Sequence, residues 1–365
     1  MKSSKKAAPA KISKAREWLN AVVFAVIVAS LVRWLLLEAF IIPSTSMEQT
    51  LLAGDFLFVS KLHYGARTPK TLLQIPLTHQ TIGRTGIPSY LDWIQLPLYR
   101  LPGFSCVKRG DKVVFNYPME LDRPIDLRTY YVKRCVGLPG DVLRIQDAQL
   151  YVNEAPQPPY PGLQYFYHLK TTAMLPAQFF EKYSIREYGP LQGGYGVHTT
   201  PATAAKLEKI ASIQDVQRIV LPLCIADPKI HPSSPAFPWN ADQLGPITVP
   251  AKGATIPINQ QTLAQYERVI TYHEGHKDVQ IDDDQHQLWI DGQQVVTYTF
   301  QQDYYFMVGD NRYNSSDSRF WGFVPQDHLV GKAVLVLFSL DPNKRLLSRR
   351  FRRGIRWKRL FRLID

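Results

Sequence analysis

The apolar run from Leu19 to Leu37 constrains the fold of this 365-residue chain more than any other feature. Wound as a helix, it would be about 28 Å long, which matches the hydrocarbon core of a bilayer. Arg33 interrupts the run near its far end, where a long side chain can reach the membrane interface, and Trp34 follows it. The strictly uncharged part ends at Val32, so the run also suits the apolar region of a cleaved signal peptide.

The positive charge of the chain is concentrated at its two ends. Residues 1–18 carry a net charge of +5 and residues 344–365 carry +9, against +12 for the whole chain, so the body is close to neutral. Binding of nucleic acid requires a basic face on the fold itself, and we therefore expect no nucleic-acid partner. The basic leader predicts a cytoplasmic N-terminus. No small-x-small cleavage site lies between the apolar run and Pro43, which favours a permanent anchor over a removed signal peptide.

The sequence after the anchor is typical of a β protein. Short segments rich in Val, Phe and Tyr, bounded by Gly, Asp, Pro or Asn, predict strands of a closed or sandwiched sheet. These segments are residues 55–61, 112–117, 130–136, 304–308 and 333–340. Two similar strand–turn–strand patterns, at 140–153 and 277–292, predict hairpins that frame an inserted lobe. An internal duplication and two unrelated hairpins explain their similarity equally well.

Cysteine and histidine give weaker signals. Cys106, Cys135 and Cys224 form no C-x-x-C pair and allow at most one disulfide, so a Cys106–Cys135 bridge and buried free thiols both stay open. His273 and His276 resemble a metal pair, but they lack the spacing of a helical two-histidine zinc site, and their polar surroundings favour a solvated loop. No other cluster has ligand spacing, so we expect no metal and no cofactor.

A candidate nucleophile directly follows the anchor. Ser46, in Pro-Ser-Thr-Ser-Met, would lie at the outer membrane surface, but a serine hydroxyl needs a base to take its proton. No histidine lies in a pattern that identifies it as that base. Lys133 lies in an apolar strand segment, where burial that lowers its pKa to about 8 would cost roughly 3 kcal/mol. Alternation sends Lys133 and Arg134 to opposite faces, although such a lysine is more often an edge-strand residue that prevents aggregation.

Four blocks of the chain resemble, in order, the signature motifs of bacterial type I signal peptidases. The first spans residues 42–55 and contains Ile-Pro-Ser-Thr-Ser-Met, and the second is Arg-Gly-Asp-Lys-Val-Val-Phe at 109–115. The third is Val-Lys-Arg-Cys-Val-Gly-Leu-Pro-Gly-Asp at 132–141, and the fourth, at 309–325, begins with Gly-Asp-Asn-Arg-Tyr-Asn-Ser-Ser-Asp-Ser-Arg. The resemblance barely touches residues 66–105, most of 156–275, or the basic tail.

This resemblance implies a membrane-bound serine endopeptidase that removes N-terminal signal peptides from exported preproteins after small-x-small (Ala-x-Ala-like) sites. It implies Ser46 as the nucleophile and Lys133 as the general base, with Ser44 and the backbone N–H of Ser46 as the oxyanion hole. Ser315 matches the serine that orients the lysine. The resemblance also implies two structural ion pairs beneath the site, Arg134 with Asp310 and Arg319 with Asp317.

An extended substrate is expected to pair, as an additional strand, with residues 40–44 and 130–133 through main-chain hydrogen bonds. The residues expected to bind the substrate are Phe40, Ile42, Pro43, Met47, Leu51, Tyr131 and Val132, of which Ile42, Met47, Leu51 and Val132 are expected to line its shallow pockets. The chain departs from the family pattern at two positions. Thr45 stands where the family often has Gly, and Gln49 stands where a Pro commonly precedes Thr-Leu. Both departures concern the rigidity of the turn rather than its chemistry.

We therefore expect a mainly β protein, in which a single N-terminal transmembrane helix precedes a β-rich, signal-peptidase-like catalytic domain with a large inserted lobe. The expected segments are a cytoplasmic tail (1–18), the anchor (19–38), the two parts of the core (39–145 and 300–342), the lobe (146–299) and a basic tail (343–365). The expected location is the bacterial inner membrane, with the catalytic domain on the periplasmic side. The expected partners are preproteins, the lipid bilayer and the secretion translocase.

Two other functional classes are less consistent with the sequence. A non-catalytic membrane-anchored protein of the same fold is disfavoured because Ser44, Ser46, Lys133 and Ser315 are all present. A self-cleaving Ser–Lys regulator would require a helix-turn-helix and a cleavable linker, and the sequence shows neither. The C-terminal tail, wound as a helix, gathers apolar residues on one half and arginines on the other, which predicts either a basic interfacial helix or a solvated tail.

Overall fold

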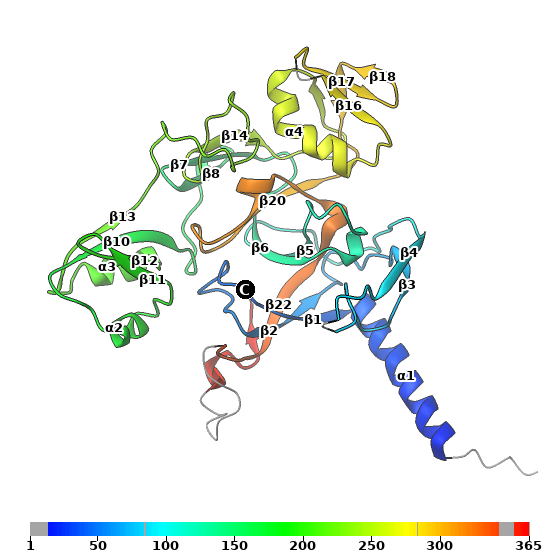
Figure 1. Ribbon diagram of the computed structural model, residues 1–365, viewed down its shortest axis with the longest axis horizontal. Helices are drawn as coiled ribbons and strands as arrows, with labels where there is room; N and C mark the ends of the chain where they lie inside the picture. The colour runs from blue at the N-terminus through cyan, green and yellow to red at the C-terminus, as the bar shows by residue number, and fades with distance from the viewer. Residues whose placement is uncertain (1–13, 84, 283, 343–353, 365) are drawn as a thin grey trace, which may run out of the picture.

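The computed structural model describes residues 14–83, 85–282, 284–342 and 354–364. Its first element is helix α1 (Lys14–Leu35), which is apolar and long enough to cross a membrane, and none of its side chains is buried. Figure 1 shows α1 projecting from the body of the molecule. The helix ends two residues before the apolar run does, because Leu37 already begins strand β1 (Leu37–Ile41).

An eight-stranded antiparallel sheet forms the centre of the molecule (Figure 1). The strand order is β1-β2-β22-β5-β6-β20-β21, and β23 pairs with β22. The bounds are β2 (Asp55–Ser60), β5 (Lys112–Asn116), β6 (Tyr130–Gly137), β20 (Tyr304–Val308), β21 (Val324–Pro325), β22 (Leu329–Ser339) and β23 (Arg362–Leu363). All five strands predicted from the sequence belong to this sheet, so the mainly β prediction is confirmed. The sheet does not close on itself, because β1 and β21 form its two edges.

Both faces of this sheet are packed, as the apolar character of its strands requires. Val113 pairs with Lys133, and Val113 belongs to an apolar cluster on one face. Val114 pairs with Val132, and both contact a second cluster that also contains Met47 from the β1–β2 connection. Successive residues of β5 and β6 therefore serve opposite faces, which places the connection from β1 to β2 against the sheet.

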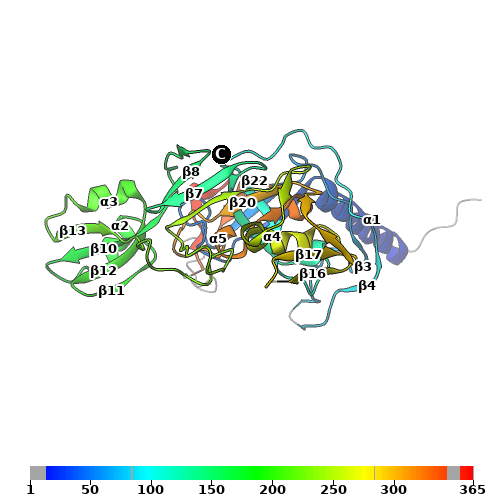
Figure 2. The same ribbon diagram turned by 90° about the horizontal axis from the view of Figure 1, so that it is seen from above.

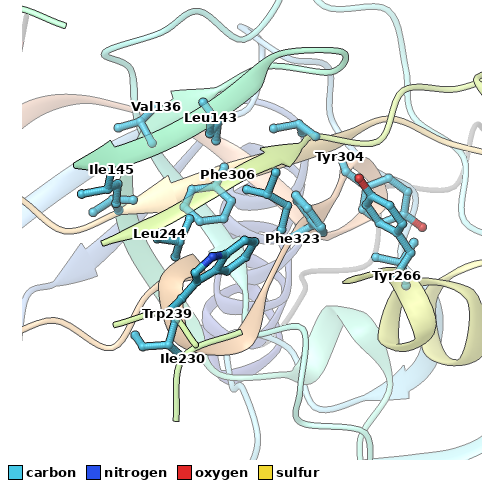
Figure 3. Packing of buried hydrophobic residues seen from close by; sticks show 14 of the residues in the cluster. Val136, Leu143, Ile145, Ile230, Trp239, Leu244, Tyr266, Tyr304, Phe306 and Phe323 are labelled. Atoms are coloured by element: carbon cyan, nitrogen blue, oxygen red, sulfur yellow. The ribbon is translucent and has the colours of Figure 1, made fainter. Parts of the chain in front are cut away.

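The largest apolar cluster joins the central sheet to the elements inserted after it. Figure 3 shows Tyr304 and Phe306 of β20 among side chains such as Leu143, Trp239 and Tyr266. These come from β7 (Val142–Gln146), from the loop before β14 (Leu244–Thr248), and from helix α4 (Gln260–His273). Part of the segment 146–299 thus contributes to the same core as the central sheet, and the bounds of the inserted lobe stay a prediction.

The two predicted hairpins are present. In the first, β7 pairs with β8 (Gln149–Val152), while β14 and β9 (Ala155–Pro156) complete a four-stranded sheet. In the second, β16 (Val279–Asp282) pairs with β17 (Gln287–Ile290), which also pairs with β18 (Gln293–Val295). Smaller pairs are β15 (Thr255–Pro257) with β19 (Thr297–Thr299), and β3 (Thr71–Gln74) with β4 (Tyr90–Gln95).

Residues 163–219 form a side lobe with an apolar cluster of its own. Its sheet has the order β11-β12-β10-β13. Its elements are β10 (Tyr165–Thr171), α2 (Ala177–Lys182), β11 (Tyr188–Leu191), β12 (Gly194–Thr199), α3 (Pro201–Leu207) and β13 (Ile213–Arg218). Figures 1 and 2 show the side lobe and α1 at opposite ends of the molecule.

The interpretation of residues 273–276 as a solvated loop is wrong for His273 and Glu274, whereas Gly275 and His276 do follow α4 in a loop. His273 is buried in the last turn of α4, and burial lowers its pKa to about 3. Glu274 is buried too, and its carboxylate accepts hydrogen bonds from the Tyr298 hydroxyl and the Gln301 N–H at 2.8 and 2.6 Å. The carboxylate therefore ties α4 to the strand that leads into β20. No group of three metal-ligating side chains occurs in the described parts of the chain.

The helical prediction for the C-terminal tail is also wrong for residues 355–364. Residues 354–364 contain a short 3₁₀ turn (Trp357–Arg359) and the strand β23. Arg359 is buried and pairs with Asp55, and Arg356 donates to the carbonyl of Ala53 at 2.8 Å. These arginines therefore bind the start of β2 instead of forming a lipid-facing stripe. Residues 343–353 lie outside the described residues.

The three cysteines are free. Cys135 is buried and packs with Val113 and Met307, whereas Cys106 and Cys224 are exposed. The structure therefore contains no Cys106–Cys135 bridge, and the prediction of buried thiols holds only for Cys135.

Candidate active site

Ser46 lies in a compact turn between β1 and β2. The Ile42 N–H donates to the carbonyl of Asp55 at 2.9 Å, which closes the base of the connection. Within it, the Leu51 N–H donates to the carbonyl of Met47 at 2.7 Å. Gln49 has a φ of 70°, a left-handed conformation that a proline ring excludes. The departure from the family pattern at this position therefore fits the turn as it is built.

Lys133 reaches this turn from the middle of β6. Its Nζ donates a hydrogen bond to the Ser46 Oγ at 2.6 Å, although the two residues are 87 positions apart in the sequence. Only 5% of Lys133 and 7% of Ser46 is exposed. Lys133 stands opposite Val113 and Arg134 stands opposite Lys112, so the two basic side chains leave β6 on opposite faces.

Burial dominates the electrostatics of Lys133. It lowers the pKa of the ammonium group from its usual 10.5 to about 8. The carboxylates of Asp317 and Asp310 act in the opposite direction, and Arg319 adds a little to the lowering. A fraction of Lys133 is therefore neutral near neutral pH, and a neutral amine can accept the Ser46 proton.

Two buried ion pairs hold the loop after β20 beside the dyad. The Arg134 guanidinium donates two hydrogen bonds to the carboxylate of Asp310, at 2.8 and 2.7 Å. Arg319 donates two to Asp317, both at 2.9 Å. Burial alone would raise the pKa of Asp317, but Arg319 and the Gly309 N–H hold it below its usual range. The two ion pairs together fix the loop.

The two further serines, Ser44 and Ser315, differ in their exposure and contacts. The exposed Ser44 places its Oγ 3.4 Å from the Ser46 Oγ. Ser315 is buried against Gly309, where a Cβ would fall 2.2 Å from the Ser315 Oγ, so only glycine fits there. Among the described residues the Ser315 hydroxyl makes no hydrogen bond of good geometry, to Lys133 or to any other group. It is nevertheless close enough to Asp317 to help lower the pKa of that carboxyl.

Two strand edges lie open beside the dyad. Within the described parts of the chain, β1 pairs only with β2, so no described strand lies along its other edge. Residues 130–133 of β6 pair with β5 on one side, whereas β20 pairs only with residues 134–137. The rings of Phe40 and Tyr130, with centroids 4.7 Å apart, link the two edges.

The expected substrate-binding residues divide into two groups by burial. Ile42, Met47 and Leu51 are fully buried in the cluster behind the sheet, so they support the open edges from beneath. The residues that keep exposed surface are Phe40, Pro43, Tyr131 and Val132.

The side lobe contacts the loop after β20, and that loop contacts the turn of Ser46. The sequence did not reveal these contacts. The carboxylate of Glu187 accepts hydrogen bonds from the side-chain amides of Asn311 and Asn314, at 2.8 and 2.7 Å. The backbone N–H of Asn311 donates to the carbonyl of Ser46 at 3.0 Å, and the Asn314 amide donates to the Thr45 hydroxyl at 3.0 Å. The two asparagines stand in the fourth motif and could have been noticed there, but no sequence signal pointed to Glu187.

A serine hydroxyl that is hydrogen-bonded to a desolvated lysine has the geometry in which a base can activate a nucleophile. The family model described as signal peptidase, peptidase S26, matches residues 15–197 and 244–338. The chain therefore belongs to this family, and the resemblance drawn from the four motifs is confirmed.

Individual relatives agree over most of their length. A signal peptidase I of Helicobacter pylori (strain J99) is 27% identical over 362 residues, which covers 93% of this chain and 90% of the relative. One from Haemophilus influenzae (strain Rd) is 25% identical over 359 residues, covering 97% of this chain and 77% of the relative. One from Buchnera aphidicola (strain APS) is 26% identical over 318 residues, which covers 86% of this chain and 72% of the relative.

Proposed function

We propose that this chain is a membrane-bound endopeptidase that removes N-terminal signal peptides from exported preproteins, with Ser46 as nucleophile and Lys133 as general base. The observation that carries the proposal is the 2.6 Å hydrogen bond between the Lys133 Nζ and the Ser46 Oγ in a buried site. Its setting in a peptidase S26 chain, similar to proteins called signal peptidase I, supports the choice of substrate.

In the proposed mechanism, neutral Lys133 accepts the proton of the Ser46 hydroxyl as the Ser46 Oγ attacks the scissile carbonyl carbon. The Ser44 hydroxyl and the Ser46 N–H donate to the oxyanion that forms. The Lys133 ammonium then gives its proton to the leaving amine as the peptide bond breaks, which leaves an acyl ester on Ser46. Lys133 next takes a proton from water, the resulting hydroxide attacks the ester, and that proton returns to the Ser46 Oγ.

The substrate is proposed to bind as an extended strand between the open edges of β1 and residues 130–133. Main-chain hydrogen bonds to both edges would supply affinity, and alternate side chains would point toward the sheet. The packed floor of Ile42 and Leu51 leaves little depth for these side chains. This supports a preference for Ala or similarly small residues at the first and third positions before the cut.

We further propose that α1 crosses the inner membrane with the N-terminus in the cytoplasm and the catalytic body on the periplasmic side. Its length, its apolar composition and the absence of buried side chains support this arrangement. The body follows α1 after a single residue, which would keep Ser46 close to the outer surface, where a signal peptide leaves the bilayer. Signal-peptide-bearing preproteins, the bilayer and the secretion translocase are the proposed partners.

Cleavage of a preprotein with an Ala-x-Ala site, in detergent, tests this function. We expect the purified chain to release the mature protein and Ser46→Ala to release none. Ser316→Ala is the matched control, because Ser316 stands in the fourth motif but is exposed, and it should retain activity. Cleavage by Ser46→Ala at the normal rate would refute the proposed nucleophile, and no cleavage by the unaltered chain would refute the proposed substrate.

A further inference from the structure

A hollow of about 690 Å³ opens between helix α4 and the loop after β20. Phe320 and Trp321 of helix α5 (Ser318–Trp321) contribute to its lining, and Figure 2 shows α5 beside α4. Further apolar and aromatic side chains in the lining are Tyr117, Met119, Tyr272, Val279 and Ile281. Helix α4 and strand β16 lie between the third and fourth motifs, so the motifs assign this hollow no role.

The hollow lies close to the catalytic dyad. The Lys133 Nζ is 5.5 Å from the centre of the Tyr131 ring, and Tyr131 stacks on Tyr117 with ring centroids 4.7 Å apart. The Tyr117 ring is therefore at most about 10 Å from the Lys133 Nζ, a distance that an extended chain covers in about three residues. Because Tyr117 also lines the hollow, a peptide held at the dyad can reach it.

A second hollow, of about 440 Å³, adjoins the first, because Phe320 lines both. Asn314 and Ser315 of the fourth motif also line this second hollow. The Asn314 side-chain amide donates to the hydroxyl of Thr45, the residue before the nucleophile, at 3.0 Å. The two hollows therefore form one groove, which we call the α4 groove and which leads from the turn of Ser46 to α4.

The proposed mechanism determines which half of a substrate can occupy the α4 groove. The Lys133 ammonium gives its proton to the leaving amine, so the chain after the cut leaves the site past Lys133. The residues before the cut are proposed to pair with the open edges of β1 and residues 130–133. The groove, which lies beyond Tyr131 and beside Ser315, therefore suits the first residues after the cut, which begin the mature protein.

The charges of the α4 groove favour an acidic substrate side chain. Arg268 of α4 is half-buried in the first hollow and forms no ion pair within the described parts of the chain. Burial raises the pKa of the Tyr117 hydroxyl and Arg268 opposes this rise, so the two groups lie near each other. Glu267 also lines the hollow but interacts with another group of the chain, and the exposed Lys229 lines the second hollow. A substrate carboxylate in the groove would therefore meet a guanidinium that can donate two hydrogen bonds to it.

We propose that the α4 groove binds the first residues of the mature chain, and that Arg268 favours preproteins with an acidic residue at about the third position after the cut. The inference rests on the proposed function, since it requires cleavage at Ser46. It gives the segment between the third and fourth motifs a part in the choice of substrate. The strand edges of β1 and β6 would read the signal peptide, and α4 would read the start of the mature protein.

Cleavage of paired peptides by the full chain in detergent tests this selection. The two peptides of a pair are identical up to the cut and differ at one later position, which is Asp in one and Lys in the other. Both leave the same acyl ester on Ser46, so a difference in kcat/KM arises before the mature part departs. With the pair placed in turn at the second, third and fourth positions, we expect the Asp peptide to be favoured by about tenfold at one of them. Equal kcat/KM values at all three positions would overturn the proposal.

Charge variants assign the preference to Arg268. Arg268→Glu should reverse it and Arg268→Gln should remove most of it. Lys277→Glu is the matched control, because Lys277 is exposed after α4 and lines neither hollow, and this variant should keep the tenfold ratio. Each ratio is measured within one preparation, so a partly misfolded variant still gives the correct value. A preference that survives in both Arg268 variants, or that disappears in Lys277→Glu, would contradict the role of Arg268.

The same assay separates this proposal from the proposed function. If the unaltered chain cleaves neither peptide of any pair, the proposed function is refuted and the groove loses its substrate. If it cleaves both peptides of every pair equally well, the proposed function stands and only the reading of the mature chain by the α4 groove is refuted.

Discussion

Replacing Lys133 by methionine tests two roles of one buried ammonium group. The group should be required for cleavage, and its burial should lower the free energy of unfolding. Burial lowers the pKa of Lys133 from 10.5 to about 8. This difference corresponds to roughly 3 kcal/mol against the charged form in the folded state. At pH 7 about one Lys133 in ten is then neutral, against about one in three thousand for an unshifted lysine.

The kinetic consequence is a rate that follows the neutral fraction. In the unaltered chain kcat/KM should rise about tenfold per pH unit below pH 8 and level off above about pH 9. Lys133→Met should abolish cleavage at every pH. Lys112→Met is the matched control, because burial lowers the pKa of Lys112 to about 8 as well, although that side chain leaves the sheet on the opposite face.

Lys133→Met, which should abolish cleavage, should nevertheless raise the free energy of unfolding at pH 7. The folded-state pKa of Lys133 lies below the unfolded value, so its destabilising effect is fully present below about pH 8 and disappears as the pH rises toward 10.5. Lys133→Met removes roughly 3 kcal/mol of this cost and loses a hydrogen bond to Ser46 worth about 1.5 kcal/mol. The variant should therefore be about 1 to 2 kcal/mol more stable at pH 7.

Urea unfolding in detergent at pH 7 and pH 10, beside a rate profile from pH 6 to 10, measures both effects. A rate that does not change between pH 6 and 10 would refute the role of a titrating lysine. If Lys112→Met shifts the pH at which the rate is half-maximal, the titrating group is Lys112 and not Lys133. A Lys133→Met variant that is less stable than the unaltered chain at pH 7 would refute the argument from desolvation.

The remaining predictions concern the metal, an ion pair and the contact with the side lobe. Because the proposed mechanism uses no metal, cleavage should survive EDTA; loss of activity that zinc restores would point to a metalloprotease instead. Asp310→Asn leaves Arg134 buried without its carboxylate and should lower the free energy of unfolding by about 3 kcal/mol, so an unchanged urea midpoint would contradict the role given to this pair. Glu187→Gln should lower kcat several-fold with KM unchanged, since Glu187 holds two asparagines that contact the Ser46 turn. The exposed Glu181→Gln, in the same lobe, should change neither, and equal kinetics for the two variants would remove Glu187 from the positioning network.

Much of the fold was predictable because its signals are local. Apolar segments bounded by turn residues identified five of the eight strands of the central sheet, because a strand packed on both faces, such as β20, is apolar along its whole length. The same signals identified both hairpins. The tail shows where a local signal fails. Its helical periodicity was real, but Arg359 pairs with the buried Asp55, more than three hundred positions earlier in the chain.

The candidate site also combines features that the sequence predicts with features that only the structure reveals. The sequence by itself determined the residue types, because a serine beside the anchor and a lysine in an apolar strand stand in recognisable motifs. Only the tertiary structure decided that the Lys133 Nζ meets the Ser46 Oγ, that Leu51 is buried beneath the open strand edges, and that Glu187 reaches the motif loop from another lobe. Each of these depends on strand pairing and packing between distant segments, and no local pattern of residues encodes a distance between them.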